Sequence, residues 1–268
     1  MATQNDGNYT LQLVECAKQY AKWTLQDGNN LQMYLNILSN FSEYTLNNQL
    51  LVMAYKPDAV MIKGWYEWPE LGVSINENAT VIQIIEPVVL DNGGKDFQVK
   101  YMADVKDTNA QYQIPVPDKL TALEALLTDR KHDVMVVDEI KKGVRAMYMP
   151  NDKSIHVKRS SQVKPDEFFT AIAAEMVHAE FGESSEGVYK RASNQLTAIG
   201  TAYALGKKYG METENISFAN LPEKYTKMSE KTSMNELEKI RANFLTIDRN
   251  IQKALEQIKQ REVNGHAR

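Results

Sequence analysis

The sequence predicts an α+β protein with two domains, and three observations support this. Apolar residues recur at helical spacing near both ends of the chain, short β-branched runs lie between turn residues, and a polar stretch with Pro115 and Pro117 divides the chain. At 268 residues, with 43% hydrophobic and 25% charged side chains, the chain is long enough and apolar enough for two folded domains. We expect domains at 1–115 and 116–268.

The first domain is expected to combine helices with a small antiparallel sheet. Periodicity predicts helices over 9–27, 31–38, 46–54 and 65–71. Short apolar runs predict strands over 60–62, 80–90 and 97–105. The last two strands should form a hairpin, because Asn92, Gly93 and Gly94 between them are strong turn residues.

The second domain should contain a small sheet and longer helices. Strands are predicted over 134–137, 144–149 and 154–157, and helices over 121–127, 166–182, 188–209 and 234–260. The last helix carries an apolar stripe from Leu237 to Ile258 at a spacing of three and four residues. Such a stripe must be buried against this chain or a partner, so the oligomeric state stays open.

Composition narrows the class of protein. No apolar run approaches the roughly 20 residues of a membrane span, and the polar N-terminus lacks the layout of a signal peptide. The single Cys16 can form no internal disulfide. A net charge of −4 gives no general attraction to nucleic acid or anionic membrane. We therefore expect a cytoplasmic protein with no membrane partner.

The helix predicted over 166–182 contains part of a metal-binding motif. Glu175 to His178 match the last four positions of H-E-x-x-H, in which two histidines on one helix face bind zinc and the glutamate acts as general base. Ala174 stands where the first histidine belongs, and 187–211 contains no Asp, Glu or His that could be the third ligand. We interpret Glu175 and His178 as remnants, and predict no catalytic residue, metal or other cofactor.

Several segments resemble ArdC-type antirestriction and LtrC-like proteins of plasmids and conjugative elements. In the first half they are YTLNNQLL at 44–51, PDA at 57–59, the tryptophan segment with LG at 71–72, EP at 86–87 and 101–110. The second half is similar to the zincin-like metallopeptidase domain of those proteins over VRAMYMP, SIHVKRS, the helix ending at His178 and the helix ending at Gly210. The resemblance implies an N-terminal domain that binds single-stranded DNA, followed by a zincin-like fold without its full metal site.

The resemblance and the residue types together suggest which residues would contact single-stranded DNA. Bases stack on aromatic rings, lysines contact phosphates and amides bond to base edges. The candidates are Tyr44, Asn47, Asn48, Lys56, Lys63, Trp65 and Trp68. The two tryptophans could instead pack in the core, and the two asparagines could cap or turn the backbone.

Charge weighs against a strong DNA contact. Residues 1–115 contain seven lysines and no arginine against thirteen Asp and Glu, a net charge of −6, and phosphate contacts supply most nonspecific affinity. An acidic surface can also imitate DNA toward a basic host defence protein.

Three functions follow from these observations. The first is a non-catalytic antirestriction or anti-defence protein of a plasmid, phage or conjugative element, which binds single-stranded DNA or a host defence protein. The alternatives are a zinc metallopeptidase with an unusual ligand set, in which His156 would replace the missing histidine, and a structural accessory protein of conjugative transfer.

Overall fold

The computed structural model describes residues 6–89, 93–128, 131–162, 164–184 and 189–265. The chain forms two compact units: unit 1 is Met1–Ile114 with Ser217–Glu238, and unit 2 is Pro115–Ile216 with Lys239–Arg268. The sequence pattern does not predict the return of 217–238 to the first unit. Helices and two small sheets confirm the predicted α+β class.

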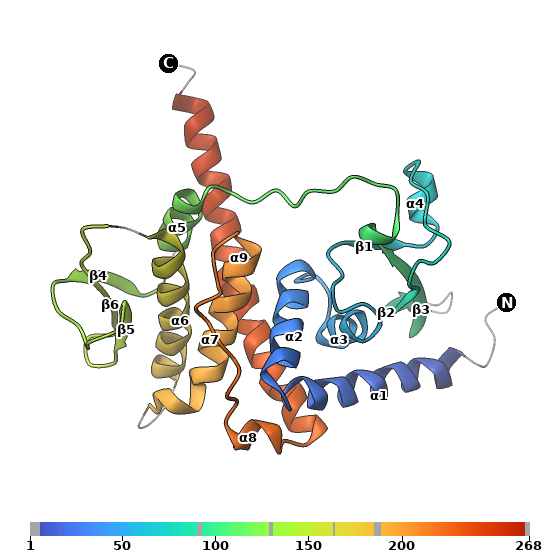
Figure 1. The fold of residues 1–268 in the computed structure, drawn as a ribbon, viewed down its shortest axis with the longest axis horizontal. Helices are drawn as coiled ribbons and strands as arrows, with labels where there is room; N and C mark the ends of the chain where they lie inside the picture. Colours follow the sequence, from blue (N-terminus) through green and yellow to red (C-terminus); the bar gives the residue numbers. More distant parts are fainter. Residues whose placement is uncertain (1–5, 90–92, 129–130, 163, 185–188, 266–268) are drawn as a thin grey trace. The chain divides into compact units, whose positions relative to one another are not determined.

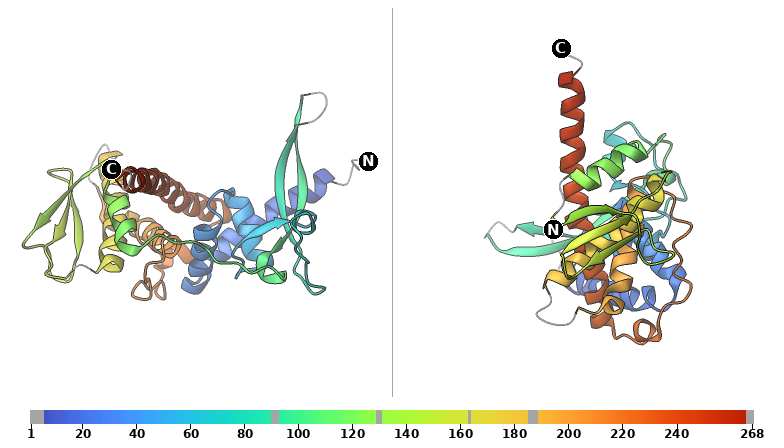
Figure 2. Two further views of the ribbon diagram at one scale, coloured as in Figure 1. Left: turned by 90° about the horizontal axis from the view of Figure 1, so that it is seen from above. Right: turned by 90° about the vertical axis from the view of Figure 1, so that its left-hand side faces the viewer.

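Unit 1 contains α-helices, a three-stranded antiparallel sheet and short connecting elements (Figure 1). The helices are α1 (Asp6–Thr24), α2 (Gly28–Asn40), α3 (Leu46–Tyr55), α4 (Glu67–Glu70) and α8 (Glu223–Thr226). The strands are β1 (Ile62–Gly64), β2 (Ile82–Val89) and β3 (Lys95–Asp104), followed by the 3₁₀ turn η1 (Val105–Asp107). The strand order is β1-β3-β2, and β2 with β3 forms the predicted hairpin, seen at full length in Figure 2.

The segment YTLNNQLL builds the framework of unit 1. Thr45 caps α3 by accepting a hydrogen bond from the N–H of Asn48. The buried Gln49 amide donates to the carbonyls of Phe41 and Tyr44, which fixes the turn before the helix. Asn48 donates to the carbonyl of Ile85 at 2.8 Å and accepts from its N–H at 2.9 Å. This motif therefore attaches α3 to its preceding turn and to the outer edge of β2.

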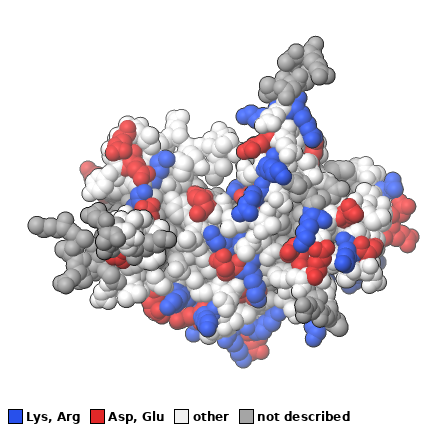
Figure 3. All heavy atoms as spheres, turned by 180° about the vertical axis from the view of Figure 1, so that it is seen from behind, with Lys and Arg blue, Asp and Glu red and all other residues white. Residues whose placement is uncertain are grey.

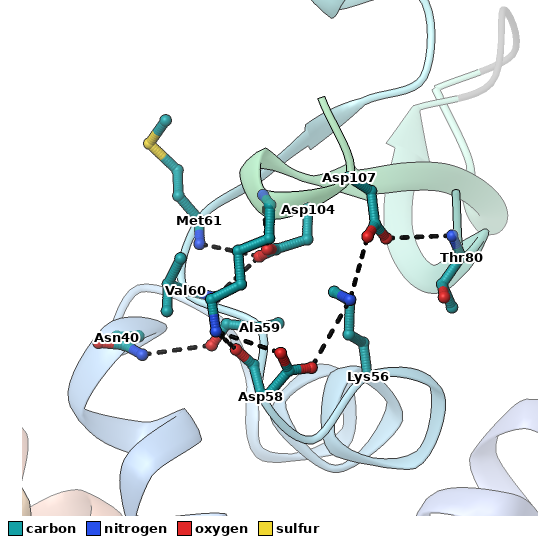
Figure 4. Close-up of polar contacts among 10 residues, drawn as sticks. Asn40, Lys56, Asp58, Ala59, Val60, Met61, Thr80, Asp104 and Asp107 are labelled. Atoms are coloured by element: carbon teal, nitrogen blue, oxygen red, sulfur yellow. Dashed lines mark hydrogen bonds and ion pairs between the residues drawn. The ribbon is translucent and has the colours of Figure 1, made fainter. Parts of the chain in front are cut away.

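A second set of contacts holds the segment after α3 (Figure 4). The fully buried Asp104 accepts hydrogen bonds from the N–H groups of Val60 and Met61, and Asp107 accepts one from Thr80. Buried carboxylates need such donors, because an unpaired charge away from water is costly. The acidic side chains thus fasten the chain before β1 to the end of β3.

Residues 217–238 join unit 1 through a close backbone contact. A Cβ added to Gly28 would lie 1.9 Å from the carbonyl oxygen of Phe218, so the start of α2 must be glycine here. Unit 1 is thus completed by a segment more than 100 residues downstream of its other parts.

Unit 2 packs a three-stranded sheet beside helices. The strands are β4 (Asp133–Val137), β5 (Ala146–Met149) and β6 (Ser154–Lys158), in the order β4-β6-β5, with a parallel and an antiparallel pairing. The helices are α5 (Lys119–Thr128), α6 (Pro165–Ser184), α7 (Arg191–Lys208) and most of α9 (Glu230–Gly265), inside which the two units divide. In the apolar stripe of α9, Leu237, Ile240, Phe244, Ile251, Ala254 and Ile258 are buried within this chain.

No helix of the described residues combines the length and the apolar character that a membrane span requires.

Candidate functional site

The residues interpreted as the remnant of a metal motif lie on α6, facing β5 and α7. Ala174 and His178 lie one turn apart on the same helix, as predicted. His178 is 0% exposed and Glu175 is also buried. Both side chains therefore point into unit 2 and away from solvent.

Glu175 is fully engaged by groups of unit 2. Its Oε2 accepts a hydrogen bond from the backbone N–H of Tyr148 on β5 at 2.7 Å, and the guanidinium of Arg191 binds both of its carboxylate oxygens. The Arg191 side chain is 36% exposed while that of Glu175 is 5% exposed, so the pair is buried at the carboxylate end. Hydrogen bonding to Glu175 raises the pKa of Arg191 against the opposing effect of burial. Both carboxylate oxygens of Glu175 are therefore bound by groups of the protein.

His178 is buried and contacts the aromatic ring of Tyr189. Its Nδ1 lies 2.5 Å from the hydroxyl of Tyr189, and the Tyr189 ring also packs edge-on against Tyr148. Burial, and then the positive charge of Arg191, lower the pKa of His178 to about 4, so the imidazole is neutral at pH 7. Its Nε2 is buried and has no hydrogen bond of normal geometry among the described residues, although Gln195 stabilises the protonated form.

Tyr148 reaches this position because Gly182 lacks a side chain. A Cβ on Gly182 would lie 2.4 Å from the Tyr148 ring. Tyr189, from the segment before α7, thus lies against His178, and the Tyr148 ring of β5 lies against Tyr189.

A metal ion does not fit these residues. Ala174 offers no ligand, Glu175 already binds a cation in Arg191, and His156 lies 3.1 Å from Asp152 on its own strand and turn. Among the residues that the structure describes, no three His, Cys, Asp or Glu side chains form a group that could hold a metal. The Arg191 guanidinium supplies a positive charge beside Glu175.

The predicted DNA-contacting residues separate into framework and surface residues. Trp68 is 2% exposed, and its indole N–H donates to the carbonyl of Ala103 at 3.0 Å. Asn48 is buried with both amide groups used by Ile85. Asn48 and Trp68 therefore belong to the framework of unit 1, and we leave them out of a binding surface.

Lys56 also has a structural role. Its ammonium lies 3.2 Å from Asp107 and 3.6 Å from Asp58 (Figure 4). Burial disfavours the charged form, but hydrogen bonding to Asp107 and the charge of Asp58 together raise the pKa of Lys56. A lysine paired with two carboxylates contributes little to phosphate binding.

Of the remaining candidates, Trp65 lines an open hollow beside β3, which we call the aromatic hollow. It has a volume of about 360 Å³ and is lined by Gly64, Trp65, Tyr66, Glu67, Glu86, Gln98, Val99, Lys100 and Tyr101. Trp65 is half-buried, whereas Tyr66 is 81% exposed and Tyr101 about half exposed. Lys63 on β1 and Tyr44 are also half-buried, and Lys100 acts electrostatically on Tyr44. Asn47 is half-buried on α3.

Sequence reasoning did not select Tyr66, Lys100 and Tyr101 as site residues. Tyr66 could have been found as the third ring in the segment from Trp65 to Trp68. Lys100 and Tyr101 come close to Tyr66 only through the pairing of distant segments, in which the N–H of Trp65 donates to the carbonyl of Tyr101. The sequence around Tyr66 carries no signal for them.

The electrostatics of the aromatic hollow are balanced rather than basic. Lys100 lies 2.9 Å from Glu67 and 3.3 Å from Glu86. Hydrogen bonding to Lys100 lowers the pKa of Glu67, and the bond to Glu67 raises that of Lys100. On the face drawn in Figure 3, Lys and Arg side chains likewise lie among Asp and Glu.

No protein-family profile matches the sequence, and no protein of curated function matches it by sequence. Comparison with solved structures shows that the chain has the α+β fold of an antirestriction protein. One solved structure that it resembles is the Mn(II)-bound form of ArdC from plasmid R388, with a TM-score of 0.51 and 13% identity over 76% of this chain and 87% of that one. The metal-free form of the same protein matches with a TM-score of 0.43 and 14% identity, covering 82% and 84% of the two chains. The expected ArdC-type fold is therefore confirmed.

Proposed function

We propose that this chain is a non-catalytic protein of the antirestriction type, carried by a mobile element, that binds single-stranded DNA through the aromatic hollow of unit 1. The observation that carries the proposal is the grouping of three accessible or half-accessible rings, Trp65, Tyr66 and Tyr101, around one open hollow. The fold shared with ArdC supports the antirestriction assignment.

The state of the α6 remnant supports a function without catalysis. The Arg191 guanidinium binds the glutamate that would activate water, and His178 is buried beneath Tyr189. A peptidase using other ligands would need a metal, so metal analysis of the purified protein tests that alternative. We expect far less than one metal ion per chain, and one tightly bound ion per chain would contradict a non-catalytic function.

The aromatic hollow favours stacking over charge as the source of DNA affinity. Stacking of a base on an aromatic side chain contributes about 1–3 kcal/mol. The lysines nearest the hollow are Lys63 and Lys100, and the latter is neutralised by Glu67 and Glu86. Binding should therefore be weak and should depend on salt less than for a basic protein.

Fluorescence anisotropy with a labelled oligothymidine at low ionic strength tests the proposal. Tyr66→Ala should weaken binding by about 5- to 100-fold, because each kcal/mol of lost stacking is a factor of about five. The matched control is Tyr112→Ala, which removes a partly exposed tyrosine that does not line the hollow. Equal binding by the two variants, or no binding by the unaltered chain, would refute this site.

A host defence protein is the second candidate partner, favoured by the net charge of −6 over residues 1–115. In that case the chain should inhibit a restriction enzyme without binding DNA itself. Cleavage assays at two salt concentrations would reveal this, because inhibition by an acidic surface weakens as salt screens the charges.

A further inference from the structure

The central strand of the unit 1 sheet is only partly covered on one edge. β2 pairs with β3 from Lys95 to Met102, whereas β1 pairs only with Met102, Ala103 and Asp104. After β1, the backbone of Trp65 bonds to Tyr101, and no strand of the described residues pairs with β3 from Lys95 to Lys100 on that side. Figure 2 shows this part of the hairpin projecting from the helices of unit 1.

The strand register indicates which backbone groups face this open edge. Asn48 binds the N–H and carbonyl of Ile85 from outside the sheet, so these groups point away from β3. In antiparallel pairing the facing residue, Val99, then also points its N–H and carbonyl away from β2. The same holds for Phe97 and Tyr101, and the bond from Trp65 to the Tyr101 carbonyl agrees with it.

The open edge of β3 carries accessible apolar side chains, and one of its N–H groups is bonded to a neighbouring side chain. Phe97 is exposed and Val99 is half-buried, and both lie on the open part of β3. The N–H of Phe97 donates to the carboxylate of its own neighbour, Asp96, at 2.8 Å. Natural proteins avoid long uncovered strand edges because they pair with other chains. This edge is therefore suited to accept another strand.

The opposite edge of the sheet is not suited to this. On β2, Asn48 already binds both backbone groups of Ile85, and Pro87 has no N–H to donate. The two outer edges of one hairpin thus differ in their capacity for strand addition.

The open segment is complementary to itself. When two copies run antiparallel about an axis at Gln98, Asp96 of one copy faces Lys100 of the other, and Phe97 faces Val99. Each of these pairs occurs twice, once on either side of the axis. Opposite charges and aromatic with β-branched pairs each stabilise adjacent strands by about 0.2–1 kcal/mol. The register also brings Phe97 and Val99, whose backbone groups face outward, into hydrogen-bonded positions.

We propose that two copies of this chain associate through antiparallel pairing of β3 with β3 over 96–100, around a two-fold axis at Gln98. Asp96 accepts from the Phe97 N–H in the single chain, and in the dimer it lies opposite Lys100 of the second copy, whose ammonium also pairs with Glu67 and Glu86 of its own chain. The interface is isologous, as expected for a symmetric dimer, and joins two three-stranded sheets into one of six strands. With only five residues paired on each copy, association should be weak and depend on concentration.

Sedimentation equilibrium of the full chain without DNA tests the dimer. The average mass should rise from 30.5 kDa toward twice that value as the concentration increases from micromolar to submillimolar. Val99→Pro should stay at 30.5 kDa over the same range, because it removes an outward N–H and leaves the ladder to β2 intact. The matched control Val99→Thr keeps the N–H and should dimerise like the unaltered chain.

Two further variants keep the test decisive if Val99→Pro fails to fold. Asp96→Lys faces Lys100 of the second copy and should shift association to at least tenfold higher concentration. Val89→Ser removes an exposed apolar side chain from β2 and should have no effect. A chain that stays monomeric throughout, or that dimerises equally with Val99→Pro or Asp96→Lys, would overturn the proposal. Dimerisation through another surface or capture of a foreign peptide at β3 would give one of these results.

The proposed dimer and the proposed DNA site share Gln98, Val99 and Lys100, which line the aromatic hollow. Their tests are kept apart by their readouts, because the mass is measured without DNA. Tyr66→Ala should leave the mass unchanged while weakening DNA binding, so a failure of the dimer and a failure of the DNA site are distinguishable.

Discussion

Replacing Arg191 by methionine should strongly destabilise unit 2. The change keeps most of the aliphatic length of the side chain but leaves the Glu175 carboxylate, among the described residues, with only the Tyr148 N–H as donor. Breaking a buried ion pair by removing one partner typically costs about 3–5 kcal/mol, because the other charge stays buried. Since the Arg191 side chain is 36% exposed, solvent screening reduces our expectation to about 2–4 kcal/mol.

Hydrogen exchange in peptides of α6 and α7 is the appropriate assay. All three tryptophans, Trp23, Trp65 and Trp68, lie in unit 1, so their fluorescence does not report on this site. Exchange in the two helices should accelerate by about 30- to 1,000-fold, which is 2–4 kcal/mol at 1.4 kcal/mol per factor of ten.

The control is Arg159→Met, because Arg159 and Asp138 form a pair in which both side chains are largely exposed. This variant should change stability by less than about 1 kcal/mol. The double variant Glu175→Gln with Arg191→Met should recover part of the loss, since no buried charge remains. Equal exchange in Arg191→Met and Arg159→Met would refute the view that the buried ion pair of Arg191 with Glu175 stabilises unit 2.

Three other predictions concern the same framework. The pKa of His178 is about 4 in the folded chain against 6.5 ordinarily, so the unfolded state binds a proton more readily. The free energy of unfolding should therefore fall by up to about 3 kcal/mol as the pH decreases from 6.5 to 4. In His178→Gln, the urea midpoint should change less with pH over this range. Ala174→His should give at most weak zinc binding and no proteolysis, because the third ligand is missing. Calorimetry with zinc measures the binding, and a casein assay measures proteolysis. Robust proteolysis by this variant would show that the ligand set is complete. Asn48→Leu should lower the free energy of unfolding by about 2–4 kcal/mol, because it leaves the N–H and the carbonyl of Ile85 without their hydrogen-bond partner. Urea unfolding followed by tryptophan fluorescence measures this change. A loss below about 1 kcal/mol would show that water replaces the amide.

The main helices and strands of both units are predictable from residue patterns. The hairpin of β2 and β3 follows from two β-branched runs around a glycine turn, and α6 runs from Pro165 to Ser184 against a prediction of 166–182. Helix α7 begins at Arg191, whereas the predicted first residue, Val188, lies outside the described residues. These elements are predictable because helical and strand periodicity are local properties of the sequence.

The roles of individual polar residues are harder to predict. Asn48 and Trp68 look like base-contacting residues in the sequence, yet each binds a backbone group of a strand 35 to 37 positions away. Burial of a polar side chain depends on which distant backbone groups need a partner, and this is decided by strand pairing rather than by neighbouring residues. Tyr66 remains accessible within the same segment because it points away from that core.

The sequence alone determined that the α6 remnant lacks a complete ligand set. Ala174 has no donor atom, and 187–211 has no acidic residue or histidine, whatever the fold. Only the tertiary structure decided what fills the site, because Arg191 and Tyr189 reach Glu175 and His178 from another segment of the chain. Tertiary structure likewise decided that the edge of β3 is open, since the length of β1 is limited by how the chain turns at Trp65 to pack Trp68 in the core. Whether a side chain has an atom that can bind a metal depends on its residue type alone. Whether that side chain or a strand edge is accessible depends on packing among distant segments.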